Sequence, residues 1–194
     1  MNMQSIQKTA NFLKEKGIQH PEIGIILGTG LGKLVNEIQI EKEIPYEIIP
    51  EFPVATVESH AGKLVYGTLR GKKVLVMQGR FHYYEGYTMQ QITFPVRVMK
   101  LLGINTLLVS NAAGAINLNF KKGTLMIIKD HINLLNNNPL IGRNINELGP
   151  RFPDMSKPYN LELIAKMHEI GKKNNIPLNT GVYAAIQGKM LETP

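Results

Sequence analysis

The sequence predicts an α/β fold. Short apolar runs alternate along the chain with segments of helical periodicity, the pattern of a sheet with helices packed on it. Runs such as 106–110 lack polar alternation and therefore suit strands that are covered on both faces. The 194 residues contain no linker, repeat or low-complexity tract, so we expect a single α/β domain over residues 1–194.

The first part of the chain predicts a helix, a strand and a hairpin. Apolar residues recur at helical spacing in 5–15, and Gly17 follows as a stop. Residues 24–27 are a short apolar run that ends in glycines, which indicates a buried strand entering a turn. The runs 64–69 and 74–77 flank a short turn and predict a β-hairpin.

The middle of the chain predicts one helix and two strands. Residues 92–102 are helix-like, with Pro95 expected in the first turn and Gly103 at the end. Residues 106–110 and 124–129 are expected to be buried strands.

The last part predicts a long loop, a helix and a final strand. Residues 136–158 are dense in Asn, Pro and Gly, and a loop of that length inside a domain is usually functional. A helix is expected at 159–173, with Leu163, Met167 and Ile170 on one face, and a strand at 182–186.

Composition excludes several classes of protein. The chain has no Cys, which rules out disulfides, iron–sulfur clusters and thiol catalysis and suits a reducing, cytoplasmic location. No apolar run could cross a membrane, and no signal-peptide core is expected at the start. The net charge of +7 suggests affinity for anions, but its Lys and Arg residues are scattered, which favours a solvated surface over a nucleic-acid interface. No His spacing indicates a metal site.

A glycine-rich turn, GTGLG at 28–32, follows the first predicted strand. It matches neither the dinucleotide-binding pattern nor the P-loop. It could hold an anion with its backbone N–H groups and the hydroxyl of Thr29, although glycines at strand ends are commonly turn residues alone.

The segment 78–87, QGRFHYYEGY, carries the densest chemistry. It follows the strand 74–77, and the carboxyl ends of strands are where α/β sheets bind ligands. Arg80 and His82 lie two residues apart and can face one side. Arg80 suits phosphate, Glu85 can tune His82, and Tyr84 offers a ring and a hydroxyl to a sugar. The alternative is an aromatic packing cluster with a surface arginine.

Four weaker motifs accompany this segment. His60, in SHAG at 59–62, is by itself most simply a surface histidine. The small residues at 110–114 allow either a ligand or a helix to approach the backbone closely. Asp130 and His131 follow a predicted strand but point to different faces, which favours structural hydrogen bonding. Glu192 is, taken alone, a surface charge.

In combination and order, these motifs resemble the trimeric class of purine nucleoside phosphorylases. The resemblance runs from about Ile23 to the last residue. It is carried by GTGLG, SHAG, QGRFHYYEGY, NAAG at 111–114, DHIN at 130–133 and RFPDMS at 151–156. It implies a three-layer fold of the phosphorylase/hydrolase type, with a central mixed β-sheet flanked by helices.

The resemblance also implies an activity, phosphorolysis of purine nucleosides such as inosine to free base and ribose (or deoxyribose) 1-phosphate, for purine salvage. It implies a homotrimer that uses inorganic phosphate as co-substrate and no metal or organic cofactor. The implied site residues are Thr29, His60, Arg80, Phe81, His82 and Ala112 for phosphate, Glu85 to orient a catalytic His82, Tyr84 for ribose, Phe152 for a neighbouring subunit's sugar, and Leu191 and Glu192 for the base.

The chain also departs from the family pattern. Thr29 stands where the family commonly has Ser, and Lys189 and Leu191 replace a proline and a base-stacking aromatic residue. Family members continue well past Pro194, so the domain is expected to lack a C-terminal part. Two alternatives stay open, a methylthioadenosine phosphorylase and an inactive truncated product that retains phosphate binding or assembly.

Overall fold

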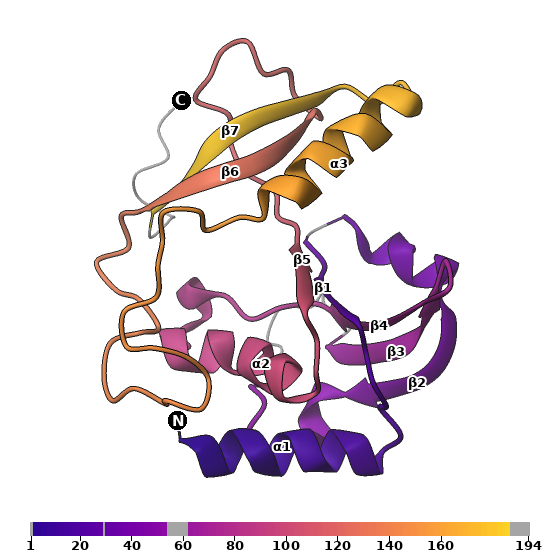
Figure 1. Cartoon of the computed structure of the whole chain (residues 1–194), viewed down its shortest axis with the longest axis vertical. Helices are drawn as coiled ribbons and strands as arrows, with labels where there is room; N and C mark the ends of the chain where they lie inside the picture. The colour runs from indigo at the N-terminus through magenta and orange to yellow at the C-terminus, as the bar shows by residue number, and fades with distance from the viewer. Residues whose placement is uncertain (1, 29, 54–61, 187–194) are drawn as a thin grey trace. The chain divides into compact units, whose positions relative to one another are not determined.

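The computed structural model describes residues 2–28, 30–53 and 62–186 (Figure 1). The chain divides into two compact units. The first comprises Met1–Ala112 and Gly142–Gly149, and the second Ala113–Ile141 and Pro150–Pro194. The organisation of residues 1–194 as one domain stays a prediction.

The first unit contains a five-stranded mixed sheet, which confirms the predicted fold class. The strand order is β2-β3-β4-β1-β5. β1 runs parallel to both β4 and β5, whereas β3 is antiparallel to β2 and β4. The strands are β1 (Ile23–Ile26), β2 (Gln39–Pro45), β3 (Lys63–Leu69), β4 (Lys72–Gln78) and β5 (Thr106–Val109).

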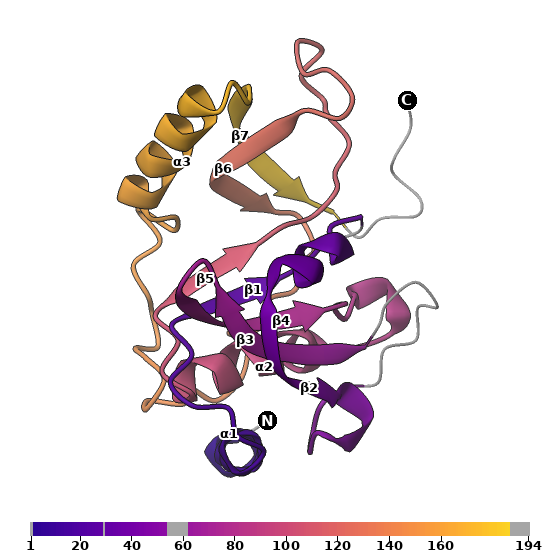
Figure 2. The same cartoon turned by 90° about the vertical axis from the view of Figure 1, so that its right-hand side faces the viewer.

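Two helices, α1 (Met3–Glu15) and α2 (Met89–Leu101), share one apolar core with this sheet. Figure 2 views α1 end-on. Alternate strand residues separate the two faces, since Leu75 and Met77 join the helical core while Val74 and Val76 pack with the short helix η1 (Gly32–Glu37). The helix predicted at 5–15 is confirmed.

The predicted hairpin is confirmed. Its turn places Arg70 and Gly71 at φ +48° and +78° between β3 and β4. Two successive residues with positive φ are the geometry of the tight turns that match strand twist.

The predicted start of the middle helix was wrong. α2 begins at Met89 and not at residue 92, because Thr88 caps it and Gln91 returns the hydrogen bond in a capping box. Pro95 therefore lies in the helix interior and not in the first turn. Gly103, at φ +94°, follows the helix as predicted.

The expectation that 106–110 is covered on both faces was also wrong. β5 is at the edge of the sheet, and Leu107, Leu108 and Val109 are 38%, 42% and 57% exposed. An apolar run in the sequence suggests a buried strand. Whether other elements cover the strand depends on its place in the sheet, which the run itself does not show.

The second unit contains two parallel strands, β6 (Leu125–Asn133) and β7 (Leu178–Ala185), and the helix α3 (Leu161–Lys173). α3 begins after Asn160, whose side chain accepts a hydrogen bond from the Leu163 N–H. β7 begins before the expected residue 182, because Gly181 sits inside the strand against Met126 and not in a turn before it.

Asp130 and His131 lie inside β6 and not after it, since the strand continues beyond an irregularity between Ile128 and Asp130. The 136–158 segment contains no helix or strand, as predicted. Within it, Ile145 and Leu148 pack against the core of the first unit. No helix in the part of the chain described is long and apolar enough to cross a membrane.

Candidate functional site

Two of the predicted site residues, Arg80 and His82, come together where β1, β4 and β5 end. Ile26 is level with Met77 on one side and Val109 on the other, so the segments that follow emerge side by side. The Ser110 hydroxyl accepts a hydrogen bond from the Gly28 N–H at 3.0 Å and donates to the Ile26 carbonyl at 3.3 Å. The glycine-rich turn and the 110–112 segment are therefore joined directly.

This approach requires glycine at position 28. A Cβ on Gly28 would lie 2.6 Å from the Ser110 carbonyl oxygen and 2.9 Å from the Asn111 Cα. Backbone atoms cannot move aside as a flexible side chain can. The first glycine of the GTGLG motif thus has a packing role in addition to any ligand role.

Arg80 links two of these segments. Its Nη1 donates to the Ser110 carbonyl oxygen at 2.7 Å, and its Nε donates to His82 Nε2 at 3.3 Å. A guanidinium has five N–H donors in a planar fork. The Arg80 and His82 side chains thus lie on the same side of the segment that follows β4. The two hydrogen bonds fix the direction of the guanidinium at the carboxyl ends of the strands.

Glu85 fixes the ring of His82. Its Oε1 lies 2.7 Å from His82 Nδ1 and accepts the His82 backbone N–H at 2.8 Å. The carboxylate side chain is only 4% exposed. Because Nδ1 faces a carboxylate and Nε2 faces the Arg80 N–H, both contacts suit the neutral tautomer with its proton on Nδ1. The short helix η3 (Tyr83–Glu85) brings Glu85 back to His82.

Tyr84 presents an open aromatic face. Its ring stacks on His82 with centroids 4.8 Å apart and planes 18° apart, and the residue is 54% exposed. A half-exposed ring beside a polar cluster is the arrangement that a sugar can contact.

Phe81 points the other way. Its ring is 3% exposed and packs with Tyr46 and Tyr87 at centroid distances of 5.2 and 5.9 Å. The alternation of side chains along an extended segment puts Phe81 in the core while Arg80 and His82 face outward. A phosphate contact at Phe81 would therefore have to come from its main chain.

Four predicted site residues, Thr29, His60, Leu191 and Glu192, lie outside the described residues. Ala112 belongs to the first unit and its backbone carbonyl accepts from the Asn111 side chain at 3.1 Å. Phe152 belongs to the second unit, where it is 86% exposed and lies below the Arg151 guanidinium at 5.9 Å.

Gln78, the first residue of the QGRFH motif, was not predicted as a site residue. Its side-chain oxygen is buried and accepts no hydrogen bond from any residue within the described ranges. Its amide nitrogen lies 3.9 Å from where a Cβ on Gly32 would be. A buried acceptor without a donor costs folding free energy, and most buried polar groups in proteins have a partner. The Gln78 amide is therefore an unusual polar group, and it lies beside the glycine-rich turn.

Asp130 and His131 have structural hydrogen bonds. Asp130 Oδ1 accepts from the His131 N–H at 2.8 Å, and His131 Nδ1 lies 3.3 Å from the Tyr159 hydroxyl. Burial, followed by the charge of Asp130, raises the pKa of Tyr159, which keeps the hydroxyl protonated. Across the described ranges, no group of three or more His, Asp or Glu side chains could hold a metal ion.

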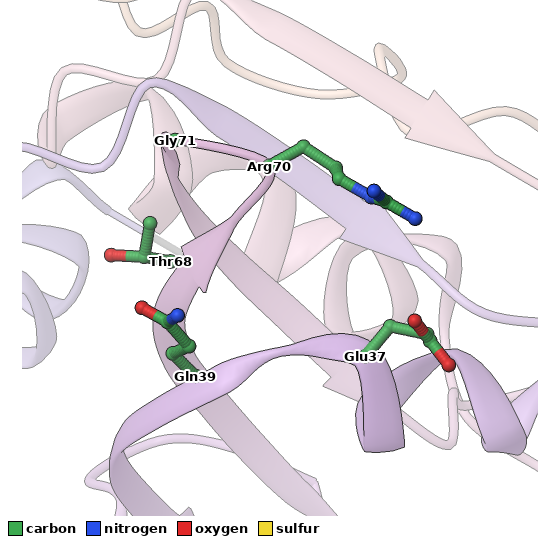
Figure 3. A pocket seen from close by; sticks show the side chains of 5 residues that line it. All are labelled: Glu37, Gln39, Thr68, Arg70 and Gly71. Atoms are coloured by element: carbon green, nitrogen blue, oxygen red, sulfur yellow. The ribbon is translucent and has the colours of Figure 1, made fainter.

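A polar hollow of about 320 Å³ lies at the turn of the β3–β4 hairpin, at the other end of β4 from Arg80 (Figure 3). It is lined by Glu37, Gln39, Thr68, Arg70 and Gly71. Arg70 and Gly71 precede β4, whereas Gln78 ends it, so this hollow is separated from the Arg80 cluster by the length of a strand.

The chain resembles proteins of known name over nearly its whole length. The sequence model of the phosphorylase superfamily matches residues 22–194. Purine nucleoside phosphorylase 1 of Bacillus subtilis is 54% identical over 189 residues, which are 97% of this chain and 70% of that protein. The purine nucleoside phosphorylase of Bos taurus is 45% identical over 96% of this chain and 66% of its own length.

Solved structures match equally well. Isoform 2 of the Schistosoma mansoni purine nucleoside phosphorylase, in complex with cytosine and ribose-1-phosphate, superposes with a TM-score of 0.93 at 45% identity. The match covers 99% of this chain and 69% of that one. A Schistosoma structure with hypoxanthine gives a TM-score of 0.92 at 43% identity.

Proposed function

Since this chain belongs to the phosphorylase superfamily, and within it to the purine nucleoside phosphorylases, we propose that its site catalyses the phosphorolysis of purine nucleosides. Inorganic phosphate would attack C1′ of the sugar, the glycosidic bond would break, and its electron pair would leave with the purine. The products are the free base and ribose (or deoxyribose) 1-phosphate.

The observation that carries this proposal is the Arg80–His82–Glu85 cluster at the end of β4. Arg80 supplies a forked cationic donor for a phosphate dianion. His82, braced by Glu85 and in contact with Arg80, gives a second polar group of fixed orientation. Donors fixed before the substrate arrives need no reorganisation as charge develops, which is how such sites lower a barrier.

The remaining roles follow the course of the reaction. Thr29, His60, the main chain at Phe81 and the Ala112 backbone would complete the phosphate cradle. The Tyr84 ring would contact the ribose. Leu191 and Glu192 would pack on and hydrogen-bond the purine, favouring 6-oxopurines. The ribosyl cation that forms between base and phosphate needs both ends held in line.

We also propose a homotrimer in which Phe152 closes over the sugar in a neighbouring subunit's site. Phe152 is 86% exposed, and Ile116 and Leu118 of the same unit are 90% and 97% exposed, so these apolar side chains are available to an interface. We propose that the enzyme uses neither a metal nor an organic cofactor. We also propose that it acts in the cytoplasm.

The activity is tested by incubating the purified chain with inosine and measuring hypoxanthine release with and without phosphate. Release that requires phosphate is expected, and Arg80→Ala should lower kcat/KM by about 10²–10³-fold, the loss typical of a main oxyanion-binding donor. Methylthioadenosine, run beside inosine, should react more slowly. A folded chain that binds phosphate but releases no base would show an inactive phosphorylase, and one that binds no phosphate would refute the site.

A further inference from the structure

We propose that Tyr46 is a positioning residue for the phosphate end of this site, acting on Arg80 through the main chain on both sides of it. This inference rests on the proposed function. Tyr46 comes from a short helix, η2 (Tyr46–Ile48), that is far from Arg80 and His82 in the sequence.

The first contact is a buried hydrogen bond to the residue before Arg80. The Tyr46 hydroxyl donates to the Gly79 carbonyl oxygen at 2.7 Å, and Tyr46 is 1% exposed. Gly79 has φ +100°, the backbone conformation that turns the chain out of β4. The hydrogen bond therefore holds the carbonyl of the turn from which Arg80 emerges.

The second contact is with the residue after Arg80. The Tyr46 and Phe81 rings pack with centroids 5.2 Å apart, inside a cluster that also includes Phe52, 5.6 Å from Tyr46 and 6.3 Å from Phe81. Aromatic pairs at these separations contribute beyond their buried area. Tyr46 thus fixes residues 79 and 81, and Arg80 between them has little freedom to turn.

This restraint matters because hydrogen bonds orient the Arg80 side chain, and a small shift of the backbone would break them. Its bonds to the Ser110 carbonyl and to His82 are 2.7 and 3.3 Å long. Binding groups must be held to within about half an ångström of their working geometry, and unsupported groups lose that precision. Burial raises the pKa of Tyr46, so the hydroxyl remains a donor over the working pH range.

The test compares Tyr46→Phe with a matched control, Tyr66→Phe. Tyr66 is also nearly buried, at 3% exposure, and its hydroxyl also donates to a backbone carbonyl, Gln19 O at 2.6 Å. Gln19 precedes β1, at the end of that strand opposite Gly28. Each variant therefore loses one tyrosine hydrogen bond to the main chain, but only Tyr46→Phe loses it next to Arg80.

Phosphate binding to each chain is measured by calorimetry, and unfolding by urea. We expect both variants to lose stability to a similar extent. Tyr46→Phe should bind phosphate about tenfold more weakly, the loss expected when a misplaced Arg80 gives up one hydrogen bond to phosphate. Tyr66→Phe should bind phosphate less than twofold more weakly. Equal phosphate affinities in the two variants would mean that Tyr46 is structural only and would overturn the proposal.

A second measurement keeps this result separate from the proposed function. The ring nitrogen chemical shifts of His82 report its tautomer and its hydrogen bond from Arg80, with no phosphate present. They should move in Tyr46→Phe and stay in Tyr66→Phe. If the wild-type chain bound no phosphate, the proposed function would fail while the His82 shifts still decided the role of Tyr46.

Should Tyr46→Phe not fold, Phe52→Leu replaces it. That change loosens the packing of the Tyr46 ring and leaves its hydroxyl in place. Smaller shifts in the same direction are expected in both measurements. Unchanged phosphate affinity and unchanged His82 shifts in a folded Phe52→Leu chain would contradict the proposal.

Discussion

Glu85 shows how one side chain sets the chemistry of another. A single carboxylate oxygen accepts from both the backbone and the ring of His82, while the Arg80 Nε contacts the opposite ring nitrogen. The carboxylate is almost fully buried, so these hydrogen bonds are poorly replaced by water. The orientation of His82 thus depends on a residue that faces away from solvent.

Glu85→Gln is expected to lower kcat/KM for inosine by roughly tenfold, because a neutral amide holds the imidazole less strongly than a carboxylate does. The His82 ring nitrogen shifts should change as well. The matched control is Glu51→Gln, since Glu51 is an exposed residue paired with Lys8 at 3.7 Å and such surface pairs contribute little. Loss of activity in both variants would argue against a specific role for Glu85.

At the scale of elements, the site depends on three parallel strands that end level with one another. Gly28, Arg80 and Ser110 follow the carboxyl ends of β1, β4 and β5, where hydrogen bonds join them. The close approach of the Gly28 and Ser110 backbones is a steric constraint on this arrangement.

Gly28→Ala should separate the ends of β1 and β5, because the new Cβ would lie 2.6 Å from the Ser110 carbonyl oxygen. We expect a loss of about 1–3 kcal/mol in the free energy of unfolding, together with weaker phosphate binding. Gly114→Ala is the control, since a Cβ there meets nothing within 4 Å among the described residues. Urea unfolding of both variants checks this, and equal stabilities would contradict the steric argument.

At the scale of the whole molecule, the proposed trimer makes each site depend on two chains. Under that proposal, one chain would supply Phe152 and another would supply Arg80. Each side chain can be removed without the other, so the two kinds of defect are separable in mixed assemblies.

Phe152→Ala and Arg80→Ala should each be weakly active alone. Mixed after dissociation and reassembly, they should regain part of the activity, because some sites then combine an intact Arg80 with a Phe152 from the other variant. The mass of the assembly, measured by light scattering, should be three times that of the chain. A monomeric mass, or no recovery on mixing, would contradict the shared site.

The sequence alone determined much of the local structure and pointed to the segment that carries the Arg80–His82–Glu85 cluster. Helical spacing with Gly17 predicted α1, a short turn predicted the β3–β4 hairpin, and the density of polar chemistry after β4 predicted the Arg80–His82–Glu85 segment. These features depend on contacts between residues close in the chain, which a sequence displays directly. The capping box that starts α2 was also readable at Thr88 and Gln91, and was missed.

Only the tertiary structure decided which distant groups meet. It put the Phe81 ring in the core, the Gly28 N–H on Ser110, the Arg80 guanidinium on the Ser110 carbonyl and the Tyr46 hydroxyl on Gly79. It also left β5 exposed at a sheet edge. Such contacts join segments separated by tens of residues, and their identity follows from strand order and packing. Residue type and spacing specify the chemistry available, whereas the fold specifies where it is brought together.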